Sequence, residues 1–117
     1  MGLKAEDIAQ INLINWFKYN FPQYKEDIAH VANQRTCSPM EGRLLKKLGV
    51  QKGFSDIFIA IPKNGYHGLF LELKVGKNKP TKEQQEFLDR KIELGYAAVC
   101  VWGWEAARDF IVEYLKE

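Results

Sequence analysis

The sequence predicts an α/β domain in which helices flank a mixed β-sheet. Two short apolar segments, residues 56–61 and 69–75, have the composition of β-strands and are joined by a turn sequence, so they predict an antiparallel hairpin. A helical segment over residues 81–94 and another apolar strand over 96–102 follow. A strand, helix and strand connected in this order form a right-handed crossover with parallel strands. The predicted sheet therefore contains both antiparallel and parallel strand pairs.

Helices are predicted at both ends of the chain. Apolar residues recur at helical spacing over residues 5–20, and Phe21-Pro22 ends that helix because the residue before proline resists helical dihedrals. Residues 105–116 form a closing amphipathic helix. The predicted apolar sides hold Ile8, Ile11, Ile14 or Asn15 and Phe17 in the first helix, and Ala106, Phe110, Ile111, Tyr114 and Leu115 in the last.

Shorter elements and helix caps are predicted between the two terminal helices. Residues 28–32 are a weak strand candidate that leads into a polar loop, and residues 40–48 predict a short helix with Gly49 as its left-handed stop. Thr81 and Gln84 have the spacing of a capping box at the start of the next helix, which Gly95 ends. The expected order is α-β-α-β-β-α-β-α.

Composition limits the possible functions. The chain has 117 residues, too few for two units that each bury a core, so a single domain over residues 1–117 is expected. A net charge of +2 is too small to indicate nucleic-acid binding by itself. The charged N-terminus and the absence of an apolar run of about 20 residues exclude a signal peptide and a membrane span, so we expect a cytoplasmic protein. Neither cysteine has the spacing of a zinc site.

Three polar residues of the hairpin are candidates for a site. Side chains alternate along a strand, so Glu72 and Lys74 face one way and the leucines of 69–75 the other. A two-residue turn at Asn64-Gly65 would set Asp56 on the opposite face from Glu72. A three-residue loop, in which Gly65 is left-handed, instead pairs Asp56 with Glu72. It also gathers the apolar side chains on one face. We predict that register, with a bulge as the alternative.

Two opposed carboxylates repel each other and call for a compensating positive charge. Lys74 supplies part of it. Oxygen ligands suit Mg²⁺ or Mn²⁺, with Asp56, Glu72 and the backbone carbonyl of Leu73 as the predicted ligands. Such an ion neutralises charge on a phosphate and activates water, while the Lys74 ammonium orients that water or stabilises the growing charge.

The segments Gly53-Phe-Ser-Asp56, Glu72-Leu-Lys74, Gln84-Gln-Glu-Phe-Leu88 and Gly95-Tyr-Ala-Ala-Val99 stand in an order that resembles the VRR-NUC branch of the PD-(D/E)XK nucleases. The resemblance runs from the first helix to Trp102. It implies a restriction-endonuclease-like fold and a divalent-metal-dependent endonuclease. The family's usual proline before the aspartate is Ser55 here, a change that concerns the turn.

The resemblance also implies roles for single residues. Asp56 and Glu72 become metal ligands and Lys74 the catalytic lysine, while Glu6 would complete the metal site through water and Gln84 would contact water or substrate. Glu6 also suits a helix N-terminus by its charge alone, and Gln84 suits a capping box without catalysis. The predicted DNA-binding residues are Asn33, Arg35, Lys52, Lys77, Lys79 and Lys82, for which solvated loop side chains are the alternative.

The function predicted from the resemblance is a structure-selective DNA endonuclease, with a Holliday junction resolvase as the leading candidate. The expected partners are branched DNA and a second copy in a homodimer, without a membrane, in a bacterial or phage-encoded intracellular protein. The alternatives are a flap or nicking nuclease that acts as a monomer and a catalytically silent DNA-binding module of the same fold.

Overall fold

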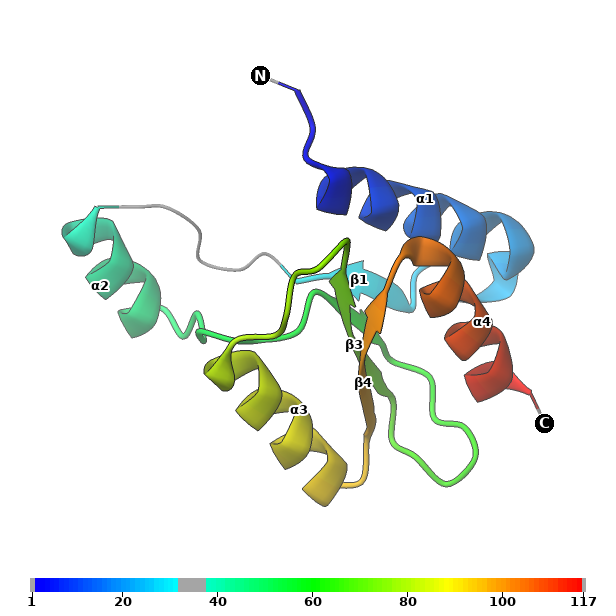
Figure 1. Cartoon of the computed structure of the whole chain (residues 1–117). Helices are drawn as coiled ribbons and strands as arrows, with labels where there is room; N and C mark the ends of the chain where they lie inside the picture. Colours follow the sequence, from blue (N-terminus) through cyan, green and yellow to red (C-terminus); the bar gives the residue numbers. More distant parts are fainter. Residues whose placement is uncertain (1, 32–37, 117) are drawn as a thin grey trace.

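The computed structural model describes residues 2–31 and 38–116, and Figure 1 shows the arrangement of the elements. In chain order these are α1 (Ala5–Asn20), the 3-10 turn η1 (Pro22–Tyr24), β1 (Ile28–His30), α2 (Pro39–Lys47), β2 (Ile57–Ile59), β3 (Leu69–Lys74), α3 (Lys82–Glu93), β4 (Ala97–Trp102) and α4 (Trp104–Leu115). The predicted α-β-α-β-β-α-β-α order is confirmed. None of the helices in the described ranges is long and apolar enough to span a membrane.

The four strands form one mixed sheet in the order β1-β2-β3-β4. The pairs β1–β2 and β2–β3 are antiparallel, whereas β3 and β4 are parallel and connected through α3. The helix α3 begins at Thr81 with the predicted capping box to Gln84 and ends before Gly95, whose φ is 96°. The predicted crossover is therefore confirmed.

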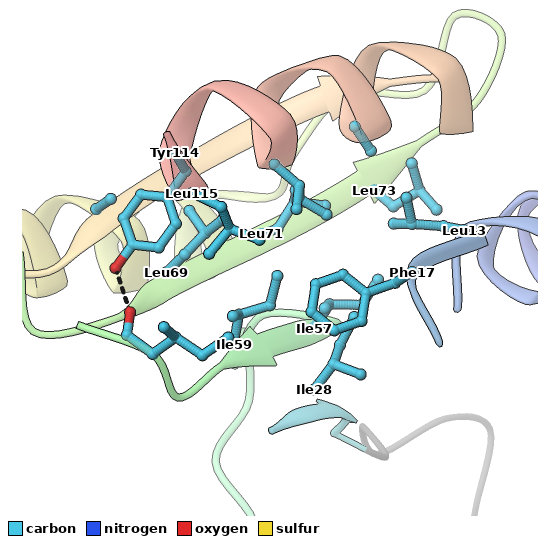
Figure 2. Packing of buried hydrophobic residues seen from close by; sticks show 14 of the residues in the cluster. Leu13, Phe17, Ile28, Ile57, Ile59, Leu69, Leu71, Leu73, Tyr114 and Leu115 are labelled. Carbon is cyan, nitrogen blue, oxygen red and sulfur yellow. Dashed lines mark hydrogen bonds between the residues drawn. The ribbon is translucent and has the colours of Figure 1, made fainter. Parts of the chain in front are cut away.

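One face of the sheet carries the main core. The side chains of alternate residues on β2 and β3 are fully buried there under α1 and α4, as Figure 2 shows. They are Ile57, Ile59, Leu69, Leu71 and Leu73. The Tyr114 hydroxyl donates a hydrogen bond to the Ile61 carbonyl at 2.7 Å and ties α4 to the hairpin. This face is the apolar layer that the sequence predicts.

Two details of the helix faces were predicted wrongly. On α1 the buried residues are Ala9, Leu13 and Phe17, whereas Ile8 and Ile11 are exposed. Apolar residues surround much of α1, so periodicity does not select one face, and the small side chain at position 9 allows α1 to approach the sheet. On α4, Ala107 is buried and the predicted Ala106 is exposed.

The opposite face of the sheet carries a smaller, aromatic cluster under α3. Phe70, Phe87 and Leu88 are buried there, and Phe58 stacks on Phe70 with ring centroids 4.4 Å apart. The Lys91 ammonium lies 5.0 Å from the centroid of the Phe87 ring. Aromatic pairs and cation–π contacts of this kind add to the area that they bury. The cluster fixes α3 on the face to which Glu72 and Lys74 also belong.

The hairpin has the predicted register but not the predicted turn. Lys63 and Tyr66 exchange both backbone hydrogen bonds around Asn64-Gly65, whose φ values of 52° and 84° are those of a two-residue type I′ turn. Residues 60–62 then lie opposite only two residues, 67 and 68, so one extra residue shifts the pairing. Phe58 consequently pairs with Phe70. The bulge given as the alternative is therefore the device that sets the register.

Candidate functional site

The three predicted residues of the hairpin lie together. Asp56 precedes β2, and extending the register places it opposite Glu72. Glu72 and Lys74 share one face of β3, with the Lys74 Nζ 3.3 Å from Glu72 Oε2. All three are buried, with exposed fractions of 9% for Asp56, 1% for Glu72 and 8% for Lys74. Buried charged side chains are rare unless they have partners, so this group is the unusual feature of the sheet.

Asp56 is held by its neighbours on both sides. Its Oδ2 accepts a hydrogen bond from the Leu73 N–H at 3.0 Å. Its backbone carbonyl accepts from the Val31 N–H at 2.8 Å and from His30 Nδ1 at 3.0 Å. The hydrogen bond of His30 was not predicted. The contact joins residues far apart in the sequence, so no local pattern signals it.

The chain before Asp56 depends on Gly53. Its φ is 84°, and a Cβ atom there would lie 2.6 Å from the backbone carbon of Glu83 at the start of α3. Only glycine permits both the left-handed conformation and this close approach. Ser55, in the place of the family's proline, is buried and donates a hydrogen bond to the Ile57 carbonyl at 3.3 Å. The Gly-x-x-Asp spacing thus has a structural cause.

Gln84 connects α3 to the carboxylate cluster. Its Oε1 accepts from the Thr81 N–H at 2.8 Å, which completes the capping box. Its Nε2 donates to Glu72 Oε2 at 3.1 Å. The two explanations offered by the sequence, a helix cap and a site residue, therefore apply to the same side chain.

The electrostatics of Glu72 are unfavourable for a carboxylate. Burial, then the neighbouring charge of Asp56, raise the pKa of Glu72 from 4.5 to about 8, although Lys74 opposes the shift. Glu72 Oε1 is buried and has no hydrogen-bond partner. Two ionised carboxylates repel each other, and a proton on Glu72 or a cation between the two groups would relieve the repulsion that Lys74 leaves.

The donor set fits a hard divalent cation. Two carboxylates and a carbonyl are ligands that Mg²⁺ and Mn²⁺ accept, with water completing the shell. The N–H and C=O of one strand residue point to the same edge, so the Leu73 carbonyl faces the edge at which its N–H binds Asp56. In the described ranges no three histidine, cysteine or acidic side chains are grouped to hold an ion. The protein side chains able to ligate one here are Asp56 and Glu72.

Glu6 lies near this group but on another element. It is half-buried in the first turn of α1 and lines a pocket of about 350 Å³ together with Val75 and Asn78, just beyond the end of β3. Cys100 pairs with Glu72 across β3 and β4. Burial and the charge of Glu72 raise the pKa of the Cys100 thiol to about 11, and Glu6 contributes to that shift. A thiol of this kind is inert.

The predicted DNA-contacting residues have different settings. Asn33 and Arg35 lie outside the described residues. Lys52 forms an ion pair with Glu83 at 3.5 Å. The side chains of Lys77, Lys79 and Lys82 are exposed around the loop between β3 and α3.

A groove of about 780 Å³ between α2 and the following loop is lined by Arg43, Lys46 and Lys52, among others. Arg43 was not predicted, although its place one turn before Lys46 and Lys47 could have suggested a basic helix face. The helix α2 has no buried residue, and Figure 1 shows it away from the sheet. Its basic side chains are therefore accessible.

Comparison with known proteins agrees with the overall fold. A solved structure described as a "VRR_NUC domain protein" superposes with a TM-score of 0.84 at 28% sequence identity, and the match covers 98% of this chain and 91% of that chain. No family model and no curated protein matches the sequence. The resemblance predicted from the motifs is confirmed at the level of the whole fold. The motif order, the mixed sheet and this similarity together show that the chain has the fold of a VRR-NUC domain.

Proposed function

We propose that this chain is a divalent-metal-dependent nuclease that hydrolyses phosphodiester bonds in DNA. The observation that carries the proposal is the buried, unpartnered Oε1 of Glu72 opposite Asp56. A fold would not keep such a group without use, because leaving a buried acceptor unsatisfied costs about 1–3 kcal/mol. The similarity to a protein described as a VRR_NUC domain adds support from an independent direction.

Asp56 and Glu72 would hold Mg²⁺ or Mn²⁺ together with the Leu73 carbonyl. Such an ion supplies neutralisation of phosphate charge and a more acidic water. The hydrogen bond from the Leu73 N–H to Asp56 Oδ2 leaves Oδ1 of that carboxylate for the ion. The hydrogen bonds from His30 and Val31 to the Asp56 main-chain carbonyl would hold the backbone of this residue in place before the ion binds. Preorganisation of this kind lowers the cost of binding.

Lys74 would act on the reacting phosphate. Its ammonium is buried and held 3.3 Å from Glu72 Oε2, so it is oriented at the site rather than free in solvent. A compact ammonium with three donors can orient the attacking water and stabilise negative charge that grows on the phosphate. The catalytic role predicted for Lys74 rests on this position.

Gln84 and Glu6 would have supporting roles. Gln84 holds Glu72 Oε2 through its Nε2 and so fixes the orientation of that carboxylate. Glu6, at the pocket beside Val75 and Asn78, would complete the site through water. Residues that orient the ligands of a metal change its affinity about 10- to 100-fold when replaced.

DNA would approach along the lysine-bearing loops. Lys77, Lys79 and Lys82 follow the Glu-x-Lys strand, and Lys52 borders the groove that Arg43 and Lys46 line. These cations would contact phosphates, so that binding weakens with added salt. Contacts of this kind sense backbone shape rather than base sequence, which favours a structure-selective enzyme. Among such enzymes, a Holliday junction resolvase is the candidate that the family resemblance implies.

A homodimer would serve that substrate, since a four-way junction presents two symmetric strands for cutting. Several large apolar side chains are exposed on α1 and α2 and would suit contact with a second copy. Examples are Ile8 and Ile11 on α1 and Met40 and Leu44 on α2. A flap or nicking nuclease that acts as a monomer remains the alternative within the same chemistry.

Cleavage of labelled linear, flap and four-way DNA with Mg²⁺ or Mn²⁺ tests the proposal. We expect cutting of branched DNA that is lost in Asp56→Ala and in Lys74→Ala. Tyr19→Ala, at an exposed position on α1, is the control variant and should cut normally. Binding without cutting under every condition would instead identify a catalytically silent DNA-binding module. Cutting that persists in both active-site variants would refute the assigned site.

A further inference from the structure

Trp102 is a large aromatic side chain left exposed beside the carboxylate cluster. It is the last residue of β4 and pairs with Lys74 in the parallel register. Side chains alternate along a strand, so Trp102 shares the sheet face of Ala98 and Cys100, which is the face of Phe70, Glu72 and Lys74. Adjacent strands are about 4.8 Å apart, so the indole begins one strand spacing from the site's lysine.

The indole is held in place and is partly open to solvent. Its exposed fraction is 45%, whereas Trp16 and Trp104 are both partly buried against other aromatic or core residues. The Trp102 Nε1 donates to the Asn78 carbonyl at 2.6 Å. Its polar atom therefore has a partner, and what remains open to solvent is the apolar surface of the ring. Such a surface is suited to stacking and not to hydrogen bonding.

The surroundings of the ring are cationic. The hydrogen bond to Asn78 ties Trp102 to the loop between β3 and α3, which carries Lys77 and Lys79 on either side of Asn78. Both lysines are exposed, and no ion pair within 4.0 Å joins either of them to an acidic residue in the described part of the chain. A fixed aromatic ring beside accessible cations is the combination that single-stranded nucleic acid binds, through its bases and its phosphates respectively.

We propose that Trp102 is a stacking platform for an unpaired nucleobase next to the scissile phosphate. The inference rests on the proposed nuclease function and narrows its substrate class. A base inside a duplex is already stacked on both sides, so only a base that is unpaired or splayed out can offer a face to the indole. The enzyme should therefore prefer bonds flanked by an unpaired nucleotide, as at a branch point, a flap or a frayed end.

The test pairs variants of the protein with abasic sites in the DNA. Affinity is measured by fluorescence anisotropy in a Lys74→Ala background that does not cut, and cleavage under single-turnover conditions in the native background. The DNA carries one abasic residue at each position around the mapped cleavage site in turn. Trp102→Ala and Trp102→Phe are compared, with Tyr19→Ala as the control. Tyr19 is 85% exposed and lies 13 residues after Glu6 on α1, or about 20 Å along the helix.

Loss of a base-stacking contact weakens binding by about 5- to 150-fold, and that is the effect expected for Trp102→Ala. At one position, an abasic residue should weaken the binding of the protein that keeps Trp102 by the same factor. At that position it should not weaken the binding of Trp102→Ala any further. Trp102→Phe keeps a ring and should retain most of the affinity, and Tyr19→Ala should bind normally. Non-additivity at a single position would establish the contact.

Three results would overturn the inference. Additive losses at every abasic position would mean that no base meets the ring. A Trp102→Phe defect as large as that of Trp102→Ala would assign the effect to the Asn78 hydrogen bond and the loop, not to stacking. A change of oligomeric state in Trp102→Ala, measured by light scattering, would identify the ring as a contact between copies. In contrast, DNA that the native chain neither binds nor cuts would refute the proposed function itself.

Discussion

Gln84 Nε2 lies 3.1 Å from Glu72 Oε2 while the Oε1 of the same amide accepts from the Thr81 backbone N–H at 2.8 Å. One side chain thus caps α3 and holds a buried carboxylate of the proposed metal centre. The aromatic cluster around Phe70 and Phe87 fixes the position of α3 on the sheet. The orientation of Glu72 therefore depends on how α3 packs. In the proposed site, α3 would orient Glu72 without supplying a metal ligand itself.

Thr81→Ala and Gln84→Ala separate these two roles. Thr81→Ala removes the hydroxyl that accepts from the Gln84 N–H and should cost about 1 kcal/mol of stability, with cleavage retained. Gln84→Ala should also destabilise the protein, and in addition lower the affinity for Mn²⁺ about 10- to 100-fold because Glu72 loses its donor. Thermal unfolding and metal titration of both variants provide the measurements. Equal metal affinities would show that Gln84 serves only as a cap.

The raised pKa of Glu72 predicts how stability without metal depends on pH. The folded protein retains the Glu72 proton up to about pH 8, whereas the unfolded chain releases it near 4.5. Between these values the folded state binds more protons, so stability falls as pH rises, by at most about 1.4 kcal/mol per pH unit. Above pH 8 Glu72 is ionised in both states, so its contribution to stability no longer changes with pH. Denaturant unfolding at pH 5 to 9 in EDTA measures it.

Glu72→Gln is the matched variant for that experiment, because it keeps the shape and removes the titration. Its stability should change less between pH 5 and 8 than that of the native chain, and it should exceed the native stability at pH 8. Parallel curves for the two proteins would contradict the assignment of the pKa to Glu72. A bound cation replaces the proton, so Mg²⁺ should flatten the native curve and not that of the variant.

Much of the fold follows from local sequence signals. The capping box at Thr81, the left-handed glycines at 49 and 95, and the alternation along residues 69–75 each act within a few residues, and all were confirmed. The face of α1 did not follow, because Ile8 and Leu13 are equally apolar and only packing against β3 and α4 decides between them. Tertiary contacts thus determine which face of α1 is buried, because the periodicity of the sequence does not.

The site also combines features that local sequence predicts with features that only tertiary contacts determine. Alternation along β3 places Glu72 beside Lys74, and burial of the isoleucines of β2 requires the register that brings Asp56 opposite. The turn was predicted wrongly because the register was assigned to the loop, whereas an extra residue at 60–62 sets it. The hydrogen bond from His30 to the Asp56 carbonyl joins residues far apart in the sequence, so no local sequence pattern predicts it.

Gly53→Ala should disrupt the approach to Asp56. The matched control is Gly65→Ala, because both glycines have a φ of 84° but only Gly53 lies against another segment, where a Cβ would meet Glu83 at 2.6 Å. Both variants should lose about 1–2 kcal/mol from the left-handed conformation. Gly53→Ala should lose more and should also cut DNA poorly, since the clash moves the chain that leads to Asp56. Equal unfolding free energies and cleavage rates for the two variants would contradict this account.

His30 is the last residue of β1, and its side chain is predicted to position Asp56 for metal binding. The imidazole Nδ1 donates to the Asp56 carbonyl from an exposed setting, so His30→Ala should leave the fold intact and lower the apparent affinity for Mn²⁺. Outer partners of metal ligands typically contribute about 10- to 100-fold. His30→Asn keeps a donor on a side chain of similar reach and should recover part of the loss.

The sharpest readout for His30 is the dependence of cleavage on metal concentration. A positioning role predicts that His30→Ala needs more Mn²⁺ to reach half its maximal rate, while the rate at saturating Mn²⁺ approaches the native value. A role in proton transfer would instead lower the saturated rate and change its pH profile. Because the Val31 N–H also holds the Asp56 carbonyl at 2.8 Å, the aspartate of His30→Ala stays at the site, and the defect should be one of affinity.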